Sequence, residues 1–289
     1  MVKVFRALGR GLLRLLFALI VLTIVLVLVP FGRQAAPHPP GQLQFRRPMQ
    51  TQAHGTLRAG AGWATIDLTP NVPLAGYPPP RRWDGVAKVL EVTALALEVQ
   101  GLTQLYISLP ALMVPPPLEE ELLRRLALPP EVCVMVTATH THSGPGGTWD
   151  NALLELGGNG AYTRERMESL VSAATLAAKR ALTPMMAATL QTAQAPWPEG
   201  PATGRAGGAI DQTISAVRAT RSDGTVVGTI VVYGMHPTVV PRSFTALSGD
   251  WPEVAQKDLE SRTRAPALVL QGAVGDATWN RDGLNPEDT

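Results

Sequence analysis

The sequence predicts a mixed α/β (α+β) domain, a mixed β-sheet with flanking helices, preceded by one N-terminal transmembrane helix. Apolar runs of strand length alternate with helical patterns, and turn signals between neighbouring runs indicate hairpins. A long run without charge near the N-terminus predicts the membrane helix. The 289 residues are 45% hydrophobic and 17% charged, which excludes a wholly disordered chain.

Residues 15–31 carry no charge and follow four basic residues, namely Lys3, Arg6, Arg10 and Arg14. A membrane span needs about 17–25 apolar residues, so this run qualifies as an uncleaved anchor. A cleaved signal peptide is the alternative, although no small-residue cleavage site follows. Basic residues on the amino side predict a cytoplasmic N-terminus and an extracytoplasmic domain, either periplasmic or extracellular. We therefore expect an anchor in residues 1–32, a Pro-rich spacer in 33–58 and a folded domain in 59–289.

The elements of the folded domain follow from periodicity and from turn residues. Residues 164–182 show the helical period, with Thr163 placed to cap the helix. A hairpin is predicted around Gly101 and a second around residues 222–224. The predicted strands are 89–100, 104–109, 132–139, 213–221, 226–233 and 265–270, and the other predicted helices are 118–126 and 252–262.

The net charge of +2, from 25 Lys+Arg and 23 Asp+Glu, excludes a generally polybasic nucleic-acid binder. The single cysteine, Cys133, excludes an intrachain disulfide framework and a Cys-rich zinc site. Because Cys133 lies in the apolar run 132–136, we expect a buried, inert thiol.

Three of the five histidines follow apolar strands, whereas His38 and His54 lie in the spacer. His140 and His142 form an H-x-H pair after the strand at 132–139, and strand alternation would place both rings on one face. His236 follows the strand at 226–233. Imidazoles at such positions suit zinc, but a pair of hydrogen-bonded histidines is the alternative.

Three glycine-containing turns accompany these histidines. Residues 144–147 either let the backbone approach a ligand or form a tight loop. Asp250 and Asp276 follow glycines and either place a polar group over a site or cap a turn. Residues 272–275 suggest phosphate binding only faintly, because no P-loop lysine accompanies them.

Six segments together resemble the catalytic N-terminal domain of the neutral/alkaline ceramidase family. Their order and intervals are similar over residues 61–280, and the histidine-rich segment is the most specific. The segments are AGWATIDLTP (61–70), LAGY (74–77), VTATHTHSGPGG (136–147), YGMHPT (233–238), SGDWPE (248–253) and LQGAVGDATWN (270–280).

The resemblance implies a zinc-dependent amidohydrolase that cleaves the N-acyl amide of ceramide. It implies zinc ligation by His140 and His236, and contact of His142 with the reacting amide or the substrate hydroxyl. It also implies a substrate-contacting arginine, for which Arg205 is the candidate, with a solvated loop arginine as the alternative. Thr278 stands where the family has a serine near the zinc.

The chain departs from the family pattern in three places. Thr278 replaces that serine, Ser108 begins a segment in which relatives often carry an acid, and no segment matches the downstream glutamate and tyrosine of the family's zinc shell. We therefore expect a domain incomplete at its C-terminus, either a fragment or a shortened relative with an unusual metal shell. A fragment should hydrolyse ceramide at least about 100-fold more slowly than a version extended by the downstream segment.

The partners expected are ceramide or another N-acyl lipid as substrate, and a membrane through the N-terminal anchor. No nucleic-acid partner is expected, and the sequence leaves the oligomeric state open. Two other functions stay open: hydrolysis of a different N-acyl amide, and binding of lipid or glycan without catalysis.

Overall fold

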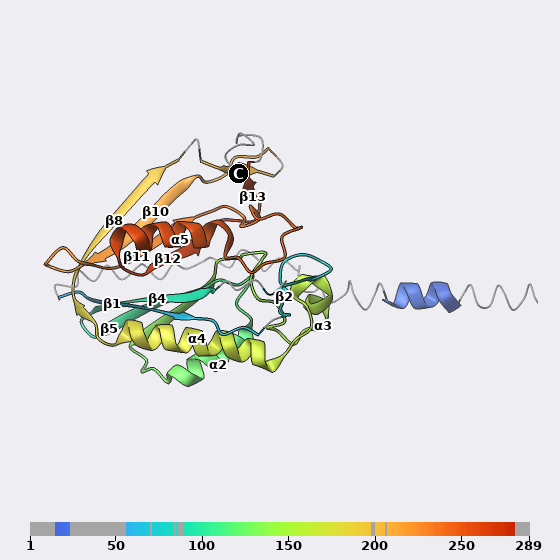
Figure 1. Cartoon of the computed structure of the whole chain (residues 1–289), viewed down its shortest axis with the longest axis horizontal. Coiled ribbons are helices and arrows are strands. Elements are labelled where there is room, and N and C mark those ends of the chain that lie inside the picture. Colours follow the sequence, from blue (N-terminus) through green and yellow to red (C-terminus); the bar gives the residue numbers. More distant parts are fainter. Residues whose placement is uncertain are drawn as a thin grey trace, which may run out of the picture. The chain divides into compact units, whose positions relative to one another are not determined.

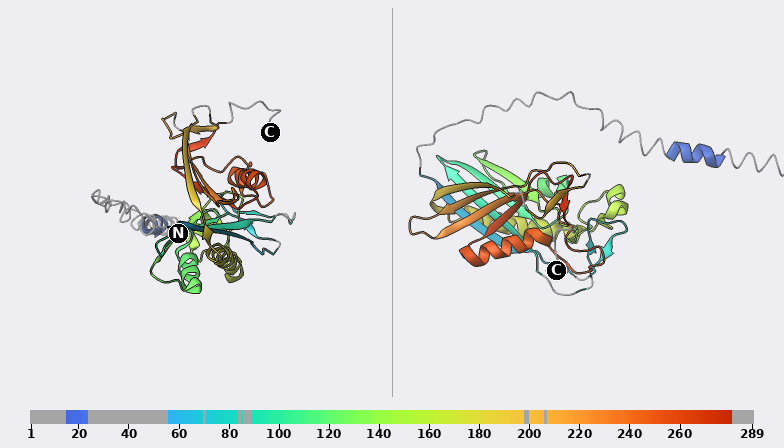
Figure 2. Two further views of the ribbon diagram at one scale, coloured as in Figure 1. Left: turned by 90° about the vertical axis from the view of Figure 1, so that its left-hand side faces the viewer. Right: turned by 90° about the horizontal axis from the view of Figure 1, so that it is seen from above.

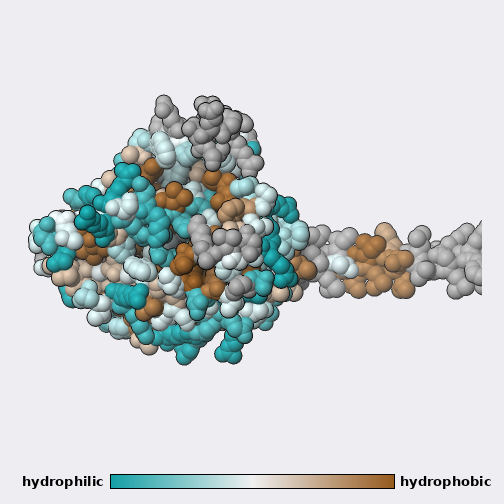
Figure 3. All heavy atoms as spheres, in the orientation of Figure 1, coloured by the Kyte–Doolittle hydropathy of each residue, from teal (hydrophilic) through white to brown (hydrophobic). Residues whose placement is uncertain are grey.

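The computed structural model describes residues 15–23, 56–69, 71–83, 85, 89–197, 200–205 and 207–280. The chain divides into two compact units, Met1–Gln52 and Ala53–Thr289. In the first unit, residues 15–23 form a helix whose apolar side chains are exposed, visible as brown spheres in Figure 3. No helix of the described residues is long and apolar enough to cross a membrane. The rest of the predicted span, residues 24–31, lies outside the described residues.

The second unit combines strands and helices, as predicted (Figure 1). Its elements are β1 (Arg58–Thr65), β2 (Pro73–Leu74), β3 (Arg81–Arg82), β4 (Glu91–Val99), β5 (Leu102–Leu109), α2 (Pro116–Leu126), β6 (Val132–Ala138), α3 (Ala152–Leu154), η1 (Glu155–Asn159), α4 (Arg164–Leu182), β7 (Met186–Ala187), β8 (Thr189–Pro196), β9 (Ala202–Gly204), β10 (Thr213–Thr220), β11 (Val226–Tyr233), α5 (Asp250–Thr263), β12 (Ala267–Gln271) and β13 (Ala277–Trp279).

Two sheets form the centre of this unit. The first has the strand order β6-β5-β4-β1-β7, and the second has the order β12-β11-β10-β8. Each is mixed, because β5–β6 and β11–β12 pair in parallel while their other neighbours pair antiparallel. The prediction of a mixed sheet is therefore confirmed, although within the described residues the strands are divided between these sheets and smaller ones.

The first sheet packs against other elements on both faces, although alternate residues of its edge strand β6 are exposed. Helices α2 and α4 cover one face, and strands of the second sheet pack on the other, as Figures 1 and 2 show. Alternation along β4 divides its side chains accordingly: Val92 and Ala94 face the helices, whereas Leu95 joins the cluster between the sheets. The Ser108 hydroxyl donates a hydrogen bond to the Val269 carbonyl at 2.9 Å, which links β5 to β12.

Close approach of α4 to β1 depends on small residues. A Cβ atom added to Gly60 would lie 2.2 Å from the Ala181 carbonyl oxygen, and one added to Gly62 would lie 2.5 Å from the Ala177 carbonyl oxygen. The buried alanines of α4 complete this contact. Helix α4 therefore lies almost in contact with the backbone of β1, and it forms one outer layer of the fold.

The predicted helices and hairpins form close to their predicted bounds. Helix α4 begins after Thr163, whose Oγ1 accepts the Arg166 backbone N–H at 3.4 Å. The β10–β11 turn contains Asp223, whose carboxylate accepts the Thr225 N–H at 2.9 Å.

The prediction of a buried Cys133 is wrong, because this side chain is exposed. Strand β6 is an edge strand of the first sheet, and its alternate residues Val132, Val134 and Val136 pack on the core. Cys133 and Met135 therefore point to the opposite face, where both are exposed.

Candidate metal centre

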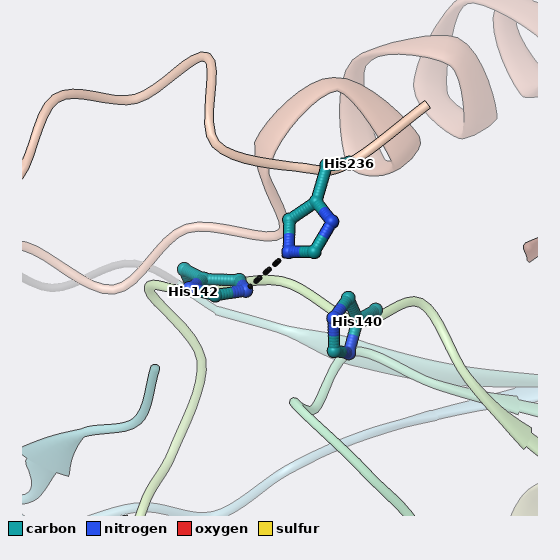
Figure 4. A group of neighbouring side chains, drawn as sticks. All are labelled: His140, His142 and His236. Carbon is teal, nitrogen blue, oxygen red and sulfur yellow. Dashed lines mark hydrogen bonds between the residues drawn. The ribbon is translucent and has the colours of Figure 1, made fainter. Parts of the chain in front are cut away.

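Three histidines from two distant segments converge beyond the ends of β6 and β11. One ligand atom from each of His140, His142 and His236 can be chosen so that all lie within 4.8 Å of one another. Nε2 of His142 lies 3.0 Å from Nε2 of His236 (Figure 4). The ring centroids are 4.7–5.1 Å apart. Among the described residues, no Asp or Glu joins this group.

Each ring is oriented through its other nitrogen by a backbone carbonyl. Nδ1 of His140 lies 2.7 Å from the Leu112 oxygen, Nδ1 of His142 lies 3.0 Å from the Gly76 oxygen, and Nδ1 of His236 lies 3.1 Å from the Val274 oxygen. Because a carbonyl only accepts, these contacts assign the proton of each neutral ring to Nδ1. The Nε2 lone pairs are then available, as in histidines that bind a metal.

The H-x-H pair does not owe its geometry to strand alternation, contrary to the sequence-based expectation. Strand β6 ends at Ala138, and His140 adopts a left-handed conformation with φ of 63°. The His140 and His142 rings lie edge to face at 90°. A non-glycine residue in this region carries backbone strain of roughly 1–2 kcal/mol, which the surrounding contacts must offset.

The loop after His142 is held by the segment before β3. Gly146 N–H donates to the Pro73 carbonyl at 2.7 Å, and Ala75 N–H donates to the Gly144 carbonyl at 3.1 Å. Of the alternatives for residues 144–147, the structure therefore shows a tight, paired loop. Gly76 has φ of 111°, and an added Cβ would lie 2.7 Å from the His142 ring. A side chain at Gly76 would displace that ring.

His236 is held by the last described strand and the loop before it. Its backbone N–H donates to the Ala277 carbonyl at 2.9 Å, and its ring Nδ1–H donates to the Val274 carbonyl. Residues 272–275, considered above for phosphate binding, thus orient a histidine.

Asp250 supports the loop that follows His236. This carboxylate is only 3% exposed, and it accepts the backbone N–H groups of Val239, Val240 and Trp251 at 3.3, 2.9 and 2.7 Å. Burial raises its pKa, and these three donors partly offset that effect. Asp250 is therefore a cap for the loop, and its oxygens face backbone donors.

Burial and neighbouring positive charges lower the pKa values of His142 and His236. Burial, followed by the charges that His140 and His236 would carry, lowers the pKa of His142 from 6.5 to about 4. The pKa of His236 is also lowered, mainly by burial, with smaller contributions from His140 and Arg205. His142 and His236 therefore stay unprotonated near neutral pH, and an unprotonated imidazole is the form that binds metal.

In the metal-free protein, the free energy of unfolding should fall as the pH is lowered from 6.5 towards about 4. The sign follows because unfolded His142 takes up its proton near the ordinary pKa, whereas the folded form resists it. Urea unfolding after chelator treatment, at pH values across this window, measures the slope. His142→Gln removes one of the two rings with a lowered pKa and should reduce this slope; equal slopes for both proteins would contradict the assignment.

Arg205 and Thr278 lie near the cluster. The positive charge of Arg205 contributes to lowering the pKa of both His142 and His236, which places it within electrostatic range of the rings. Its backbone N–H donates to the Asp276 carbonyl at 2.8 Å. Thr278 pairs with Thr203 between β13 and β9, directly after the residue whose carbonyl holds His236.

Sequence reasoning missed the groups that orient the rings. Leu112, Gly76 and Val274 act through backbone carbonyls, which any residue would supply, so side-chain identity gives no signal. Gly76 alone of these lies in a segment that the sequence analysis singled out, LAGY, which resembles the family.

The fold and the cluster together define a mixed α/β protein with a candidate metal centre between its loops. Comparison with known protein families identifies the family to which this chain belongs. The sequence profile described as "Neutral/alkaline non-lysosomal ceramidase, N-terminal" matches residues 70–280. Because this match covers most of the chain, the protein belongs to that family, and the resemblance found in the sequence is confirmed.

Solved structures show the same fold. A ceramidase described as complexed with C2 superposes with a TM-score of 0.71 at 22% identity, over 78% of this chain and 39% of that one. Neutral ceramidase from Pseudomonas aeruginosa gives a TM-score of 0.72 at 22% identity, over 81% of this chain and 42% of that one. The chain thus spans about two fifths of the length of these structures. A search among curated proteins found no match.

Proposed function

We propose that the protein is a zinc-dependent amidohydrolase that cleaves the N-acyl amide of ceramide to a sphingoid base and a fatty acid. The convergence of His140, His142 and His236, whose ligand atoms lie within 4.8 Å of one another, carries this proposal, and the Nε2 contact between His142 and His236 adds to it. With both Nδ1 atoms donating to carbonyls, two neutral rings would present their lone pairs to each other at 3.0 Å. That approach is repulsive unless a positive charge lies beside it. Since the lowered pKa values oppose a proton, a metal cation fits the donor set best.

His140 and His236 would hold the ion, and the carbonyls of Leu112 and Val274 would fix their rings. A bound zinc ion lowers the pKa of a coordinated water to about 7 and polarises a carbonyl. His142 would take and return the proton at Nε2, while Gly76 keeps its Nδ1 proton in place. Arg205 would attract the amide oxygen, and the Thr278 hydroxyl would bind the substrate.

Family membership and the histidine cluster support a zinc-dependent amidohydrolase, and ceramide as the substrate is the most specific part of the proposal. Hydrolysis of another N-acyl amide is the second candidate, because Thr278 stands in the position of the family's serine. Binding of lipid or glycan without catalysis is the third. Metal content separates the third candidate from the others, and a panel of N-acyl substrates separates the first two.

The zinc-loaded 289-residue chain in detergent should release fatty acid from an N-acyl sphingoid substrate. Removing zinc with a chelator should lower the rate on the order of 100-fold or more, since Lewis-acid assistance supplies several kcal/mol. Adding zinc back should restore it. Slow release of fatty acid still supports the proposal if the chelator abolishes it. Release that the chelator does not change, or no release from any amide tested, would contradict the proposal.

We also propose that the domain is extracytoplasmic and anchored by residues 15–31. The support is the charge-free run behind four basic residues. Protease added to intact cells should digest the bulk of the chain and spare its amino end. Full protection of the domain, with digestion only after lysis, would refute this topology.

A further inference from the structure

Arg81, at the start of β3, reaches into the space between the two loops that carry the clustered histidines. One guanidinium nitrogen donates to the His142 carbonyl oxygen and also to the Ser143 hydroxyl at 3.2 Å. The other donates to the carbonyls of Arg242 and Phe244 at 3.3 and 2.5 Å. One side chain thus binds both the His142 loop and the loop that leads from His236 to α5.

The segment before Arg81 holds the ring of the same histidine. The Nδ1–H of His142 donates to the Gly76 carbonyl, and the centroid of the Tyr77 ring lies 5.0 Å from that of the His142 ring. The Arg81 guanidinium carbon lies 4.9 Å from the centre of Tyr77, so the three groups form a continuous series of contacts. His142 is therefore held at its ring by Gly76 and Tyr77 and at its backbone by Arg81.

A planar guanidinium suits this position better than an ammonium group. Four acceptors from two loops surround it, and five fixed N–H donors can serve several of them at once. A lysine would retain the charge but not the fixed fork. Arg82, the next residue, is exposed and makes none of these contacts.

We propose that Arg81 is a positioning residue that fixes His142 against His236 by fastening the two histidine-bearing loops together. Without Arg81, the two loops would still meet through the His142 N–H bond to the Pro237 carbonyl at 3.4 Å and the pairing of Ser143 with Ser248, but the side-chain bridge of four hydrogen bonds between them would be lost. The Nε2 separation of 3.0 Å, which sets the position of His142 for proton transfer, would then vary. The catalytic part of this inference rests on the proposed function, whereas the structural part does not.

The test compares Arg81→Ala with Arg82→Ala in the full chain, with ¹⁵N-labelled histidine and no metal. The Nδ1 proton of His142, identified by its loss in His142→Gln, should be protected in the wild type and in Arg82→Ala. It should exchange rapidly in Arg81→Ala. Guanidinium ion at a low, non-denaturing concentration should restore protection, whereas sodium at the same ionic strength should not. Arg81→Lys should show the same rapid exchange as Arg81→Ala. If the alanine variant does not fold, the lysine variant is used in its place.

With zinc and an N-acyl sphingoid substrate, Arg81→Ala should lower kcat on the order of 10- to 100-fold, with KM little changed, because small displacements of a catalytic group are costly. Guanidinium should recover part of kcat. An unchanged Nδ1 signal, or a loss that guanidinium does not reverse, would overturn the role of Arg81. If the wild type shows no hydrolysis, the proposed function fails, and the metal-free spectra still decide the positioning role.

Discussion

Replacing His236 by alanine should weaken zinc binding by the full chain at least about 100-fold, because a lost ligand costs more than the loss of a supporting group. His236 supplies one of the Nε2 atoms that meet at 3.0 Å, and its ring is fixed by the Val274 carbonyl. His140→Ala should have a similar effect. Competition with a chromophoric zinc chelator measures the dissociation constants.

His142→Ala provides the matched comparison, because all three rings lie in the same cluster. In the proposed assignment this variant retains most of the zinc affinity and loses amide hydrolysis, since His142 transfers a proton. Loss of zinc as complete as in His236→Ala would instead make His142 a third metal ligand. Unchanged zinc affinity in all three variants would refute the metal centre.

Asp250→Ala should lower the free energy of unfolding by roughly 3 kcal/mol or more, because buried donors without partners each cost about 1–3 kcal/mol. Three backbone N–H groups, from Val239, Val240 and Trp251, would lose their acceptor. Asp250 also has φ of 58°, which alanine tolerates poorly. The loop after His236 would loosen, and zinc affinity should fall with stability. Urea unfolding measures the change.

Asp258→Ala is the control on the same helix, α5. Asp258 is exposed, and among the described residues its carboxylate pairs only with the exposed Arg262, at 2.8 Å. Its loss should change the free energy of unfolding by no more than about 0.5–1 kcal/mol. Asp250→Asn, which keeps one acceptor oxygen, should fall between the two. Equal stability of Asp250→Ala and Asp258→Ala would show that the buried carboxylate does not hold the loop.

Much of the fold could be predicted from local patterns. Helix α4 and its Thr163 cap, and the β10–β11 hairpin, follow from periodicity and turn residues that act within the segment itself. The partition of strands into separate sheets could not be predicted, because it depends on contacts between distant segments, such as Ser108 with Val269. The exposure of Cys133 was missed for the same reason: apolar neighbours do not reveal that β6 is an edge strand.

The convergence of the three histidines was predicted, but its cause was not. Strand ends suggested proximity, whereas the structure depends on a left-handed His140 and on backbone carbonyls. Arg205 lies in electrostatic range of the rings, and its contact with substrate stays a prediction. The metal-ligand roles of His140 and His236 and the proton-transfer role of His142 likewise stay predictions.

X-ray absorption at the zinc edge of the zinc-loaded 289-residue chain tests the central claim most directly. The account predicts imidazole scattering from two histidines with Zn–N distances of about 2.0–2.1 Å, reduced to one histidine in His236→Ala. A zinc environment without imidazole, or one that is the same in His236→Ala as in the wild type, would contradict it.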